Sequence, residues 1–200
     1  MPKISPEKIQ LRKQEILDKA FEIFSTKGYS QTSMENIVRY SGISKGGLYT
    51  HFKSKEEILL AIAEKRFQLR SDWVQQMADI ESASEKIILY LRWALDGLQN
   101  ESAQKEIRFT IEFWSILSKD SSKSEIPQVR YNKFQKDLEG LLLDGVQKGE
   151  FRQDLDTKNA VYLILTSLDG IGFTDAVMGI KISESAISEY INMILNYLRR

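Results

Sequence analysis

Apolar residues recur at the three- and four-residue spacing of a helix over most of this chain. Between residues 6 and 27 the stripe ends in a glycine stop, Gly28, and it consists of Ile16, Leu17, Ala20, Phe21, Ile23 and Phe24. Comparable stripes predict further helices over about residues 33–42, 44–53, 55–79, 84–99, 101–119, 127–147, 156–178 and 183–197. No strand-like alternation persists, so the pattern predicts an all-α fold.

The stretch from Thr32 to Lys55 has the punctuation of two short helices joined by a tight turn. Ser33 is suited to cap the first helix, Gly42 to end it in a left-handed conformation, and Ser44 to cap the second. This order predicts a helix-turn-helix, whose expected partner is double-stranded DNA.

The second short helix is expected to present a polar face to a groove of DNA. Leu48 and Phe52 lie four positions apart and should face the core, so the remaining residues face outward: Lys45, Gly46, Gly47, Tyr49, Thr50 and His51. Each glycine weakens a helix by roughly 1 kcal/mol relative to alanine. The two glycines would be explained if the helix backbone approaches the groove wall closely, where larger side chains would not fit.

The helix that follows begins with a predicted capping box of Ser54 and Glu57, flanked by Lys53 and Lys55. A helix N-terminus beside lysines is suited to hold a phosphate. Residues 1–9 are expected to form an arm, which either frays or touches the DNA backbone.

The segment GISKGGLYTHFKSKEEIL resembles the signature of the TetR family of bacterial transcriptional repressors. The similarity is detailed from about Ile9 to Phe67 and only architectural beyond. One departure is Val38, where the family more often has alanine. The resemblance implies a helix-turn-helix domain over residues 1–54 and a helical effector-binding and dimerisation domain over residues 55–200. It also implies a homodimeric repressor that binds a palindromic operator and is released by an unidentified small-molecule effector.

Resemblance and geometry together select the residues expected at the DNA. Base-edge or groove-wall contacts are assigned to Lys45, Gly46, Thr50 and His51, with Ser44 and Gly47 beside them; phosphate contacts are assigned to Thr32, Ser33, Tyr49, Lys53 and Lys55. The alternatives remain that the two serines only cap helices and that Lys53 is a solvated charge.

The last two helices are unusually apolar for the end of a chain. By resemblance they would pair with the same helices of a second subunit through Leu165, Leu168, Gly172, Ala176, Ile187, Ile191, Ile194, Leu195 and Leu198. The alternative is that these residues fill the core of a monomer.

The middle helices are rich in aromatic residues, and the resemblance implies an effector pocket among them. The candidates are Trp73, Trp93, Phe109, Glu112, Phe113, Trp114, Phe134, Tyr162 and Phe173. Plain packing is the alternative for each aromatic residue. Glu112 would pair either with a cationic ligand, with solvent or with Arg108.

Composition narrows the remaining choices. Cysteine is absent and there is one histidine, so neither a metal site nor another cofactor is expected. There is no signal peptide and no apolar run approaching ~18 residues, so the protein is expected in the cytoplasm rather than in a membrane. Net charge is zero, but residues 1–60 carry 10 basic and 7 acidic side chains, an excess in the direction that DNA requires.

Two other functions compete with a DNA-binding regulator. An enzyme is the first, although the chain has no phosphate loop, zinc motif or nucleophile elbow. The second is a helical protein-interaction module whose helix-turn-helix no longer binds DNA.

Overall fold

The computed structural model describes residues 5–123 and 125–199, and all regular secondary structure in these ranges is helical. The helices are α1 (Pro6–Lys27), α2 (Met34–Ser41), α3 (Lys45–His51), α4 (Lys55–Gln76), α5 (Ala83–Asp96), α6 (Glu101–Leu117), α7 (Glu125–Gln147), α8 (Thr157–Ala176) and α9 (Glu184–Arg199), with short 3-10 helices η1 (Gly97–Gln99) and η2 (Ser121–Lys123). The predicted all-α fold is confirmed.

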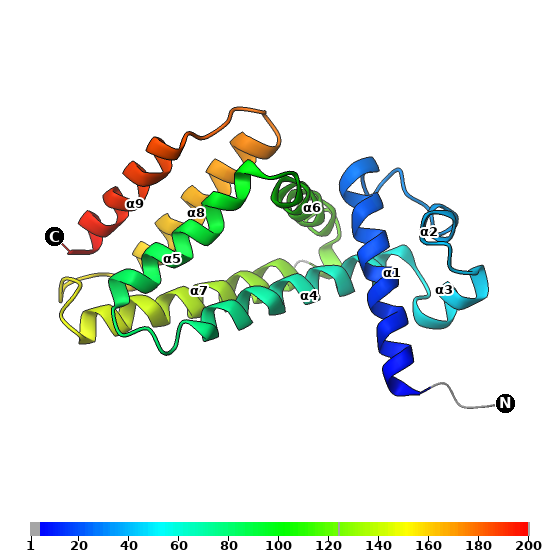
Figure 1. Cartoon of the computed structure of the whole chain (residues 1–200), viewed down its shortest axis with the longest axis horizontal. Helices are drawn as coiled ribbons and strands as arrows, with labels where there is room; N and C mark the ends of the chain where they lie inside the picture. Colours follow the sequence, from blue (N-terminus) through cyan, green and yellow to red (C-terminus); the bar gives the residue numbers. More distant parts are fainter. Residues whose placement is uncertain (1–4, 124, 200) are drawn as a thin grey trace.

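The helices form a small group at one end and a longer bundle beside it (Figure 1). Helices α1, α2 and α3 gather at the end opposite the C-terminus, and α4 leads from them into the bundle alongside α7. Helix α6 lies across the junction and contacts both α1 and α8. Any displacement of α6 would therefore act on both parts.

Two clusters of buried apolar side chains match this division. The first cluster holds α1, α2, α3 and the start of α4 together and consists of Ile16, Ala20, Ile23, Phe24, Ile37, Ile43, Leu48, Phe52, Ile58, Leu59, Ile62 and Ala63, with Phe109, Phe113 and Leu117 added from α6. The second cluster joins α5, α7, α8 and α9, with Met77 just after α4. Helix α4 spans the space between them, because Ile58 lies in the first and Trp73 packs on the second.

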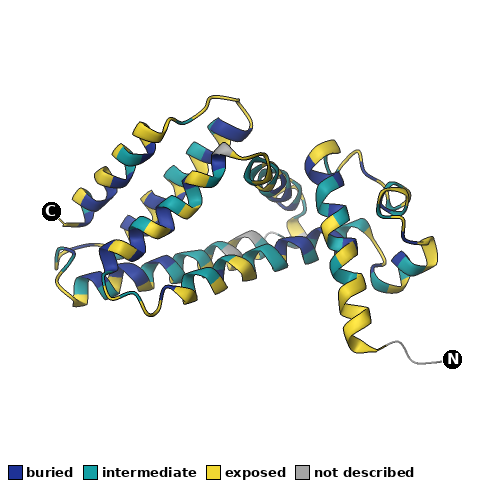
Figure 2. Cartoon of the chain, viewed as in Figure 1, coloured by how far each residue is buried: buried dark blue, intermediate teal, exposed yellow. Residues whose placement is uncertain are grey.

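Local signals predicted most helix limits closely. Helix α1 has the predicted limits, although residues 6–9 begin it rather than an arm, and residues 1–4 lie outside the described part of the chain. Helix α4 ends at Gln76 and α6 at Leu117, a few residues earlier than predicted, and the expected loop before α7 contains η2. The first half of α1 stands clear of the core and is exposed (Figure 2).

Helix α5 begins earlier than its apolar stripe because of a distant carboxylate. Ser82 caps it, and Glu150 accepts hydrogen bonds from the backbone N–H groups of Ala83 and Ser84, each at 2.8 Å. Burial acts to raise the pKa of Glu150, but these bonds outweigh it and lower the pKa to about 2. The segment after α7 thus secures the start of α5.

Candidate nucleic-acid interface

The turn between α2 and α3 forms through local hydrogen bonds. Ser33 Oγ accepts from the Asn36 N–H at 3.1 Å, and Asn36 Oδ1 accepts from the Ser33 N–H at 2.9 Å, which completes a capping box. Gly42 ends α2 at φ 71°, a left-handed conformation that glycine adopts without strain. Ile43 follows and is buried in the first cluster. The predicted helix-turn-helix is therefore formed.

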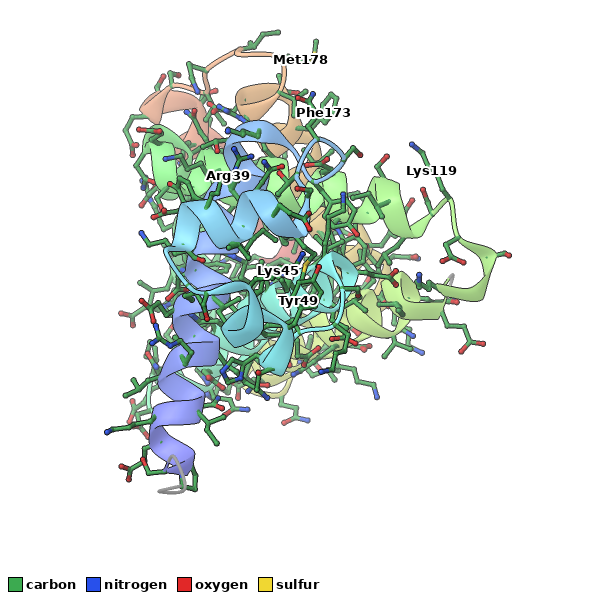
Figure 3. The ribbon with its side chains drawn as sticks, turned by 90° about the vertical axis from the view of Figure 1, so that its right-hand side faces the viewer. Arg39, Lys45, Tyr49, Lys119, Phe173 and Met178 are labelled. Atoms are coloured by element: carbon green, nitrogen blue, oxygen red, sulfur yellow. The ribbon has the colours of Figure 1, made fainter. Side chains whose placement is uncertain are left out.

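Helix α3 is held by its apolar side and exposes the other. Ser44 Oγ accepts from the Gly47 N–H at 3.1 Å, and Leu48 and Phe52 are buried. Lys45, Gly46 and Thr50 are exposed, and Figure 3 looks onto this end of the molecule, with Lys45 and Tyr49 labelled beside each other on α3. The side chains expected at the groove therefore share one open face.

The two glycines of α3 have different surroundings. A Cβ atom at Gly46 would meet nothing within 4 Å, whereas one at Gly47 would lie 3.0 Å from Ser44 Oγ and 3.2 Å from Ile43 Cγ2. Packing within the chain accounts for Gly47. It leaves Gly46 unexplained, which fits close approach of an outside partner.

The lysines of this face have weak internal partners. Lys45 Nζ lies 3.7 Å from Glu35 Oε1, with both side chains more than half exposed, and Lys53 Nζ donates to the Tyr49 carbonyl at 2.8 Å. Exposed ion pairs contribute about 0–1 kcal/mol, so phosphates could replace these partners at little cost. The Glu57 carboxylate accepts from the Lys53 N–H rather than from that of Ser54, which alters the predicted capping box.

Thr32 and Lys55 differ from the expectation of a phosphate contact. Thr32 is 2% exposed, and its hydroxyl donates to the Gly28 carbonyl at 2.8 Å. Lys55 Nζ donates to the Tyr29 carbonyl at 2.8 Å and lies 4.2 Å from the centroid of the Tyr29 ring. Burial lowers the pKa of Lys55. The Thr32 side chain thus bonds within the loop between α1 and α2, and the Lys55 side chain ties this loop to the start of α4.

The remaining expected residues lie at or near the open face. Ser33 and Ser44 are exposed, but their side-chain oxygens cap α2 and α3, which agrees with the alternative that these serines serve as helix caps. Tyr49 and His51 are half-buried. Sequence reasoning overlooked Arg39, an exposed side chain in the last turn of α2 on the end of the molecule that Figure 3 faces. Its basic charge on the polar side of α2 was the available signal.

The structure does not bring the nine pocket candidates together. Phe109 and Phe113 are buried in the first cluster, Trp114 packs against that cluster, and Phe134 contacts Phe67 at a centroid distance of 4.9 Å. Trp73 and Trp93 stack at 4.9 Å near the surface. Tyr162 and Phe173 are 55% and 42% exposed. Helix periodicity groups residues on a stripe but does not determine which neighbour the stripe faces.

Glu112 bonds to backbone rather than to Arg108. Its Oε1 accepts from the N–H groups of Tyr29 at 2.8 Å and Ser30 at 3.4 Å. Arg108 instead donates to the Ala176 carbonyl at 3.0 Å and to Gln104. Glu112 therefore joins α6 to the loop before α2.

Most residues expected at a dimer interface are buried inside the chain. This holds for Leu165, Gly172, Ala176, Ile187, Ile191, Ile194, Leu195 and Leu198, while Leu168 is partly buried. The exposed apolar residues of these helices lie on a different side: Tyr162, Leu163 and Phe173 in α8, Val177 and Met178 just after it, and Met193 in α9. Within one chain, these helices therefore turn most of the residues expected at the interface toward their own core.

Two surface depressions are present near α6. The larger, of about 580 Å³, is lined by Arg108, Asp175 and Lys181 together with neighbouring residues of α6 and the end of α8, and the smaller, of about 360 Å³, lies between α1 and α6. None of the nine pocket candidates lines either depression. Over residues 5–123 and 125–199 no group of histidine and carboxylate side chains is arranged to hold a metal. In the same ranges no helix has the length and apolar character needed to cross a membrane.

Fold and surface together define a helix-turn-helix regulator with a separate helical domain. The family of bacterial regulatory proteins, tetR family, matches residues 16–62, and the tetracyclin repressor-like C-terminal domain matches residues 82–186. The chain belongs to the TetR family of transcriptional regulators. This membership removes the enzyme alternative, because the family and the relatives are regulators.

Individual relatives are similar over most of their length. The chain is 28% identical over 173 residues to the uncharacterized HTH-type transcriptional regulator YfiR of Bacillus subtilis, covering 85% of this chain and 82% of YfiR. It is 32% identical over 142 residues to the HTH-type transcriptional regulator QacR of Staphylococcus aureus, covering 70% and 73%. Among solved structures, Salmonella enterica GusR has the same fold, with a TM-score of 0.78, 20% identity and coverage of 98% and 99%.

Proposed function

We propose that this protein is a homodimeric transcriptional repressor that binds a palindromic operator and releases it when a small-molecule effector binds. The observation that carries the DNA part is the outer face of α3, where Lys45, Gly46 and Thr50 are exposed while Leu48 anchors the helix. The proposal also places the protein in the cytoplasm, where the DNA that it binds is found.

Within this proposal the residues of the open face have separate roles. Lys45, Gly46, Thr50 and His51 read base edges or press on the groove wall. Tyr49, Ser33 and Lys53 contact the phosphate backbone, and Arg39 joins them from α2. Thr32 and Lys55 act indirectly, since their side chains position the loop between α1 and α2.

The homodimer would form through the exposed apolar side of α8 with Met193 of α9. Tyr162, Leu163 and Phe173 are each more than two-fifths exposed, and Tyr162 and Phe173 lie about three turns apart on the same side of α8. A patch of this kind is typical of an interface between subunits. A two-fold dimer would present two α3 helices ~34–36 Å apart to successive major grooves, so the operator would be palindromic.

Release by an effector would act through α4 and α6, since each of these helices contacts both clusters. A ligand that binds the conformation with mismatched α3 helices shifts the population away from the DNA-bound form. Domain limits of 1–54 and 55–200 suit this mechanism, because α4 begins at Lys55 and carries the connection.

A fluorescence-anisotropy titration tests the proposal. The probe is the DNA upstream of the protein's own gene, titrated at several salt concentrations beside a random-sequence duplex. We expect selective binding that weakens steeply with salt. If no duplex, including those selected from a random pool, binds better than the control, the protein-interaction alternative replaces the proposal.

A further inference from the structure

Three helices of the bundle carry buried polar atoms that lack partners. Arg70 Nε of α4, the Tyr90 hydroxyl of α5 and the Tyr131 hydroxyl of α7 are all buried, and none has a hydrogen-bond partner among the residues that the structure describes. Tyr90 as a whole is 1% exposed. An unpaired buried donor or acceptor costs about 1–3 kcal/mol, so such groups are rare without a functional reason.

The Arg70 guanidinium lies among aromatic rings. Its Cζ atom is 3.8 Å from the centroid of Phe134 and 5.3 Å from that of Tyr90, and Trp73 packs against Tyr90 at 6.4 Å. Burial lowers the pKa of Arg70 to about 10, although the charges of Asp169 and Asp137 act in the opposite direction. The desolvated cation is therefore incompletely compensated.

Neither nearby carboxylate completes the pairing. In the described ranges no ion pair within 4.0 Å joins Arg70 to Asp137 or Asp169, and Asp137 already accepts from the Ser71 hydroxyl at 3.0 Å. Desolvation by neighbouring atoms raises the pKa of Asp169, with the Arg70 charge acting against it. The position beside Arg70 is thus open to another acceptor.

We propose that Arg70, Tyr90 and Tyr131 bind the carboxylate head group of an amphipathic small molecule, with Phe134 and Trp73 against its apolar part. All three unpaired atoms can donate a hydrogen bond, and a carboxylate only accepts, so a carboxylate is the head group that suits them. A cationic head group would leave these donors unpaired beside a like charge. This inference rests on the proposed effector response and specifies the chemical class of the effector.

The site must open before a ligand enters. Tyr90 is almost fully buried, and the two surface depressions described above do not include these residues. A ligand would therefore select a conformation in which α4, α5 and α7 separate. Because α4 also carries Ile58 of the first cluster, opening at Arg70 would be transmitted toward the DNA-binding helices.

The test uses the full chain without DNA. Decanoate and 1-naphthoate supply a carboxylate on a chain and on a ring, with decan-1-ol and decyltrimethylammonium as neutral and cationic controls. Binding is followed by tryptophan fluorescence, since Trp73 lies beside Tyr90. We expect at least one carboxylate to bind saturably and more tightly than both controls.

Two conservative variants separate this role from packing. Tyr90→Phe and Tyr131→Phe remove only the unpaired hydroxyls, so the melting temperature should stay the same or rise, while the carboxylate Kd rises roughly tenfold or more. Tyr197→Phe, on α9, is the control and should leave the Kd unchanged. A Kd that neither site variant changes, tighter binding of the cation, or no saturable binding of either carboxylate would overturn the inference.

DNA binding is measured separately by anisotropy on the same proteins without ligand. The two site variants should bind DNA as the unaltered protein does, because neither residue lies near α3. Carboxylate binding by a protein that binds no DNA would support this inference while removing the repressor proposal. DNA binding without carboxylate binding would support the repressor proposal and overturn this inference.

Discussion

The carboxylate of Glu112 in α6 accepts a hydrogen bond from the backbone N–H of Tyr29, at 2.8 Å, and so joins α6 to the loop between α1 and α2. The carbonyl of the same Tyr29 accepts from Lys55 Nζ, also at 2.8 Å. One residue in the loop before α2 is thus tied both to α6 and to the first turn of α4. A movement of either helix would pull on the helix-turn-helix through this loop.

Replacing Glu112 should therefore loosen the junction. In Glu112→Ala the Tyr29 N–H loses its partner, and we expect the unfolding free energy to fall by about 1–2 kcal/mol, with weaker DNA binding. Glu112→Gln keeps an acceptor oxygen, so its unfolding free energy should lie between those of Glu112→Ala and the unaltered protein. Glu101→Ala is the control on the same helix, since the Glu101 side chain is 80% exposed in its ion pair with Lys105. Equal melting curves for Glu112→Ala and Glu101→Ala would contradict the role of the bond.

Gly46 and Gly47 should respond differently to alanine. Gly46→Ala meets open space and improves helix propensity by up to about 1 kcal/mol, so the protein should be as stable or more stable. Its DNA affinity should nevertheless fall at least tenfold, because the added methyl group keeps α3 away from the groove. Gly47→Ala crowds Ser44 Oγ and should lower stability. Undiminished DNA binding by a stable Gly46→Ala protein would show that α3 does not approach so closely.

The lysines of the open face should affect binding in separate ways. Lys45→Ala should alter sequence preference, whereas Lys53→Ala should weaken binding to all duplexes and reduce the salt slope by about 1. Lys55→Ala should act mainly on stability, since its Nζ bonds to the Tyr29 carbonyl. Anisotropy over a salt series with two duplexes, combined with thermal unfolding, measures all three. A salt slope lowered by Lys55→Ala but not by Lys53→Ala would restore Lys55 as the phosphate contact.

A charge on the exposed side of α8 should separate the subunits. Phe173→Glu is expected to give a folded monomer, because this side chain is exposed within one chain and its replacement leaves the core intact. Leu69→Glu, which also replaces an exposed apolar residue but lies on α4, should remain dimeric. Sedimentation equilibrium gives the masses. An unaltered dimer for Phe173→Glu would move the interface elsewhere.

Glu150 should contribute to stability in a defined pH range. Its pKa falls from an ordinary value of 4.5 to about 2 in the folded chain, so the folded protein resists protonation of this group. The stabilisation is present above about pH 4.5 and is lost as the pH falls toward 2. Glu150→Gln should therefore lose less unfolding free energy than the unaltered protein between these values. Urea unfolding at several pH values provides the comparison, and identical pH profiles would rule out this contribution.

The sequence alone determined the features that depend on residues within about four positions. Ser33, Gly42 and Ser44 could be assigned to caps and the turn because each capping bond spans three or four residues. The helical stripes determined the all-α class for the same reason. The outward face of α3 also followed, since Leu48 and Phe52 leave only one side free.

Only the tertiary structure decided which neighbour each helix faces. A stripe on α8 or α9 can pack on its own chain or on another, and the rotation of each helix within the bundle placed Ile187 inside and Phe173 outside. The roles of Glu112 and Lys55 depend on Tyr29, which lies 83 residues from Glu112 and 26 from Lys55. The Arg70 guanidinium lies 5.3 Å from the centroid of the Tyr90 ring because α4 and α5, two separate helices, come together at these residues. Such relations arise from packing over long sequence distances, where local periodicity carries no information.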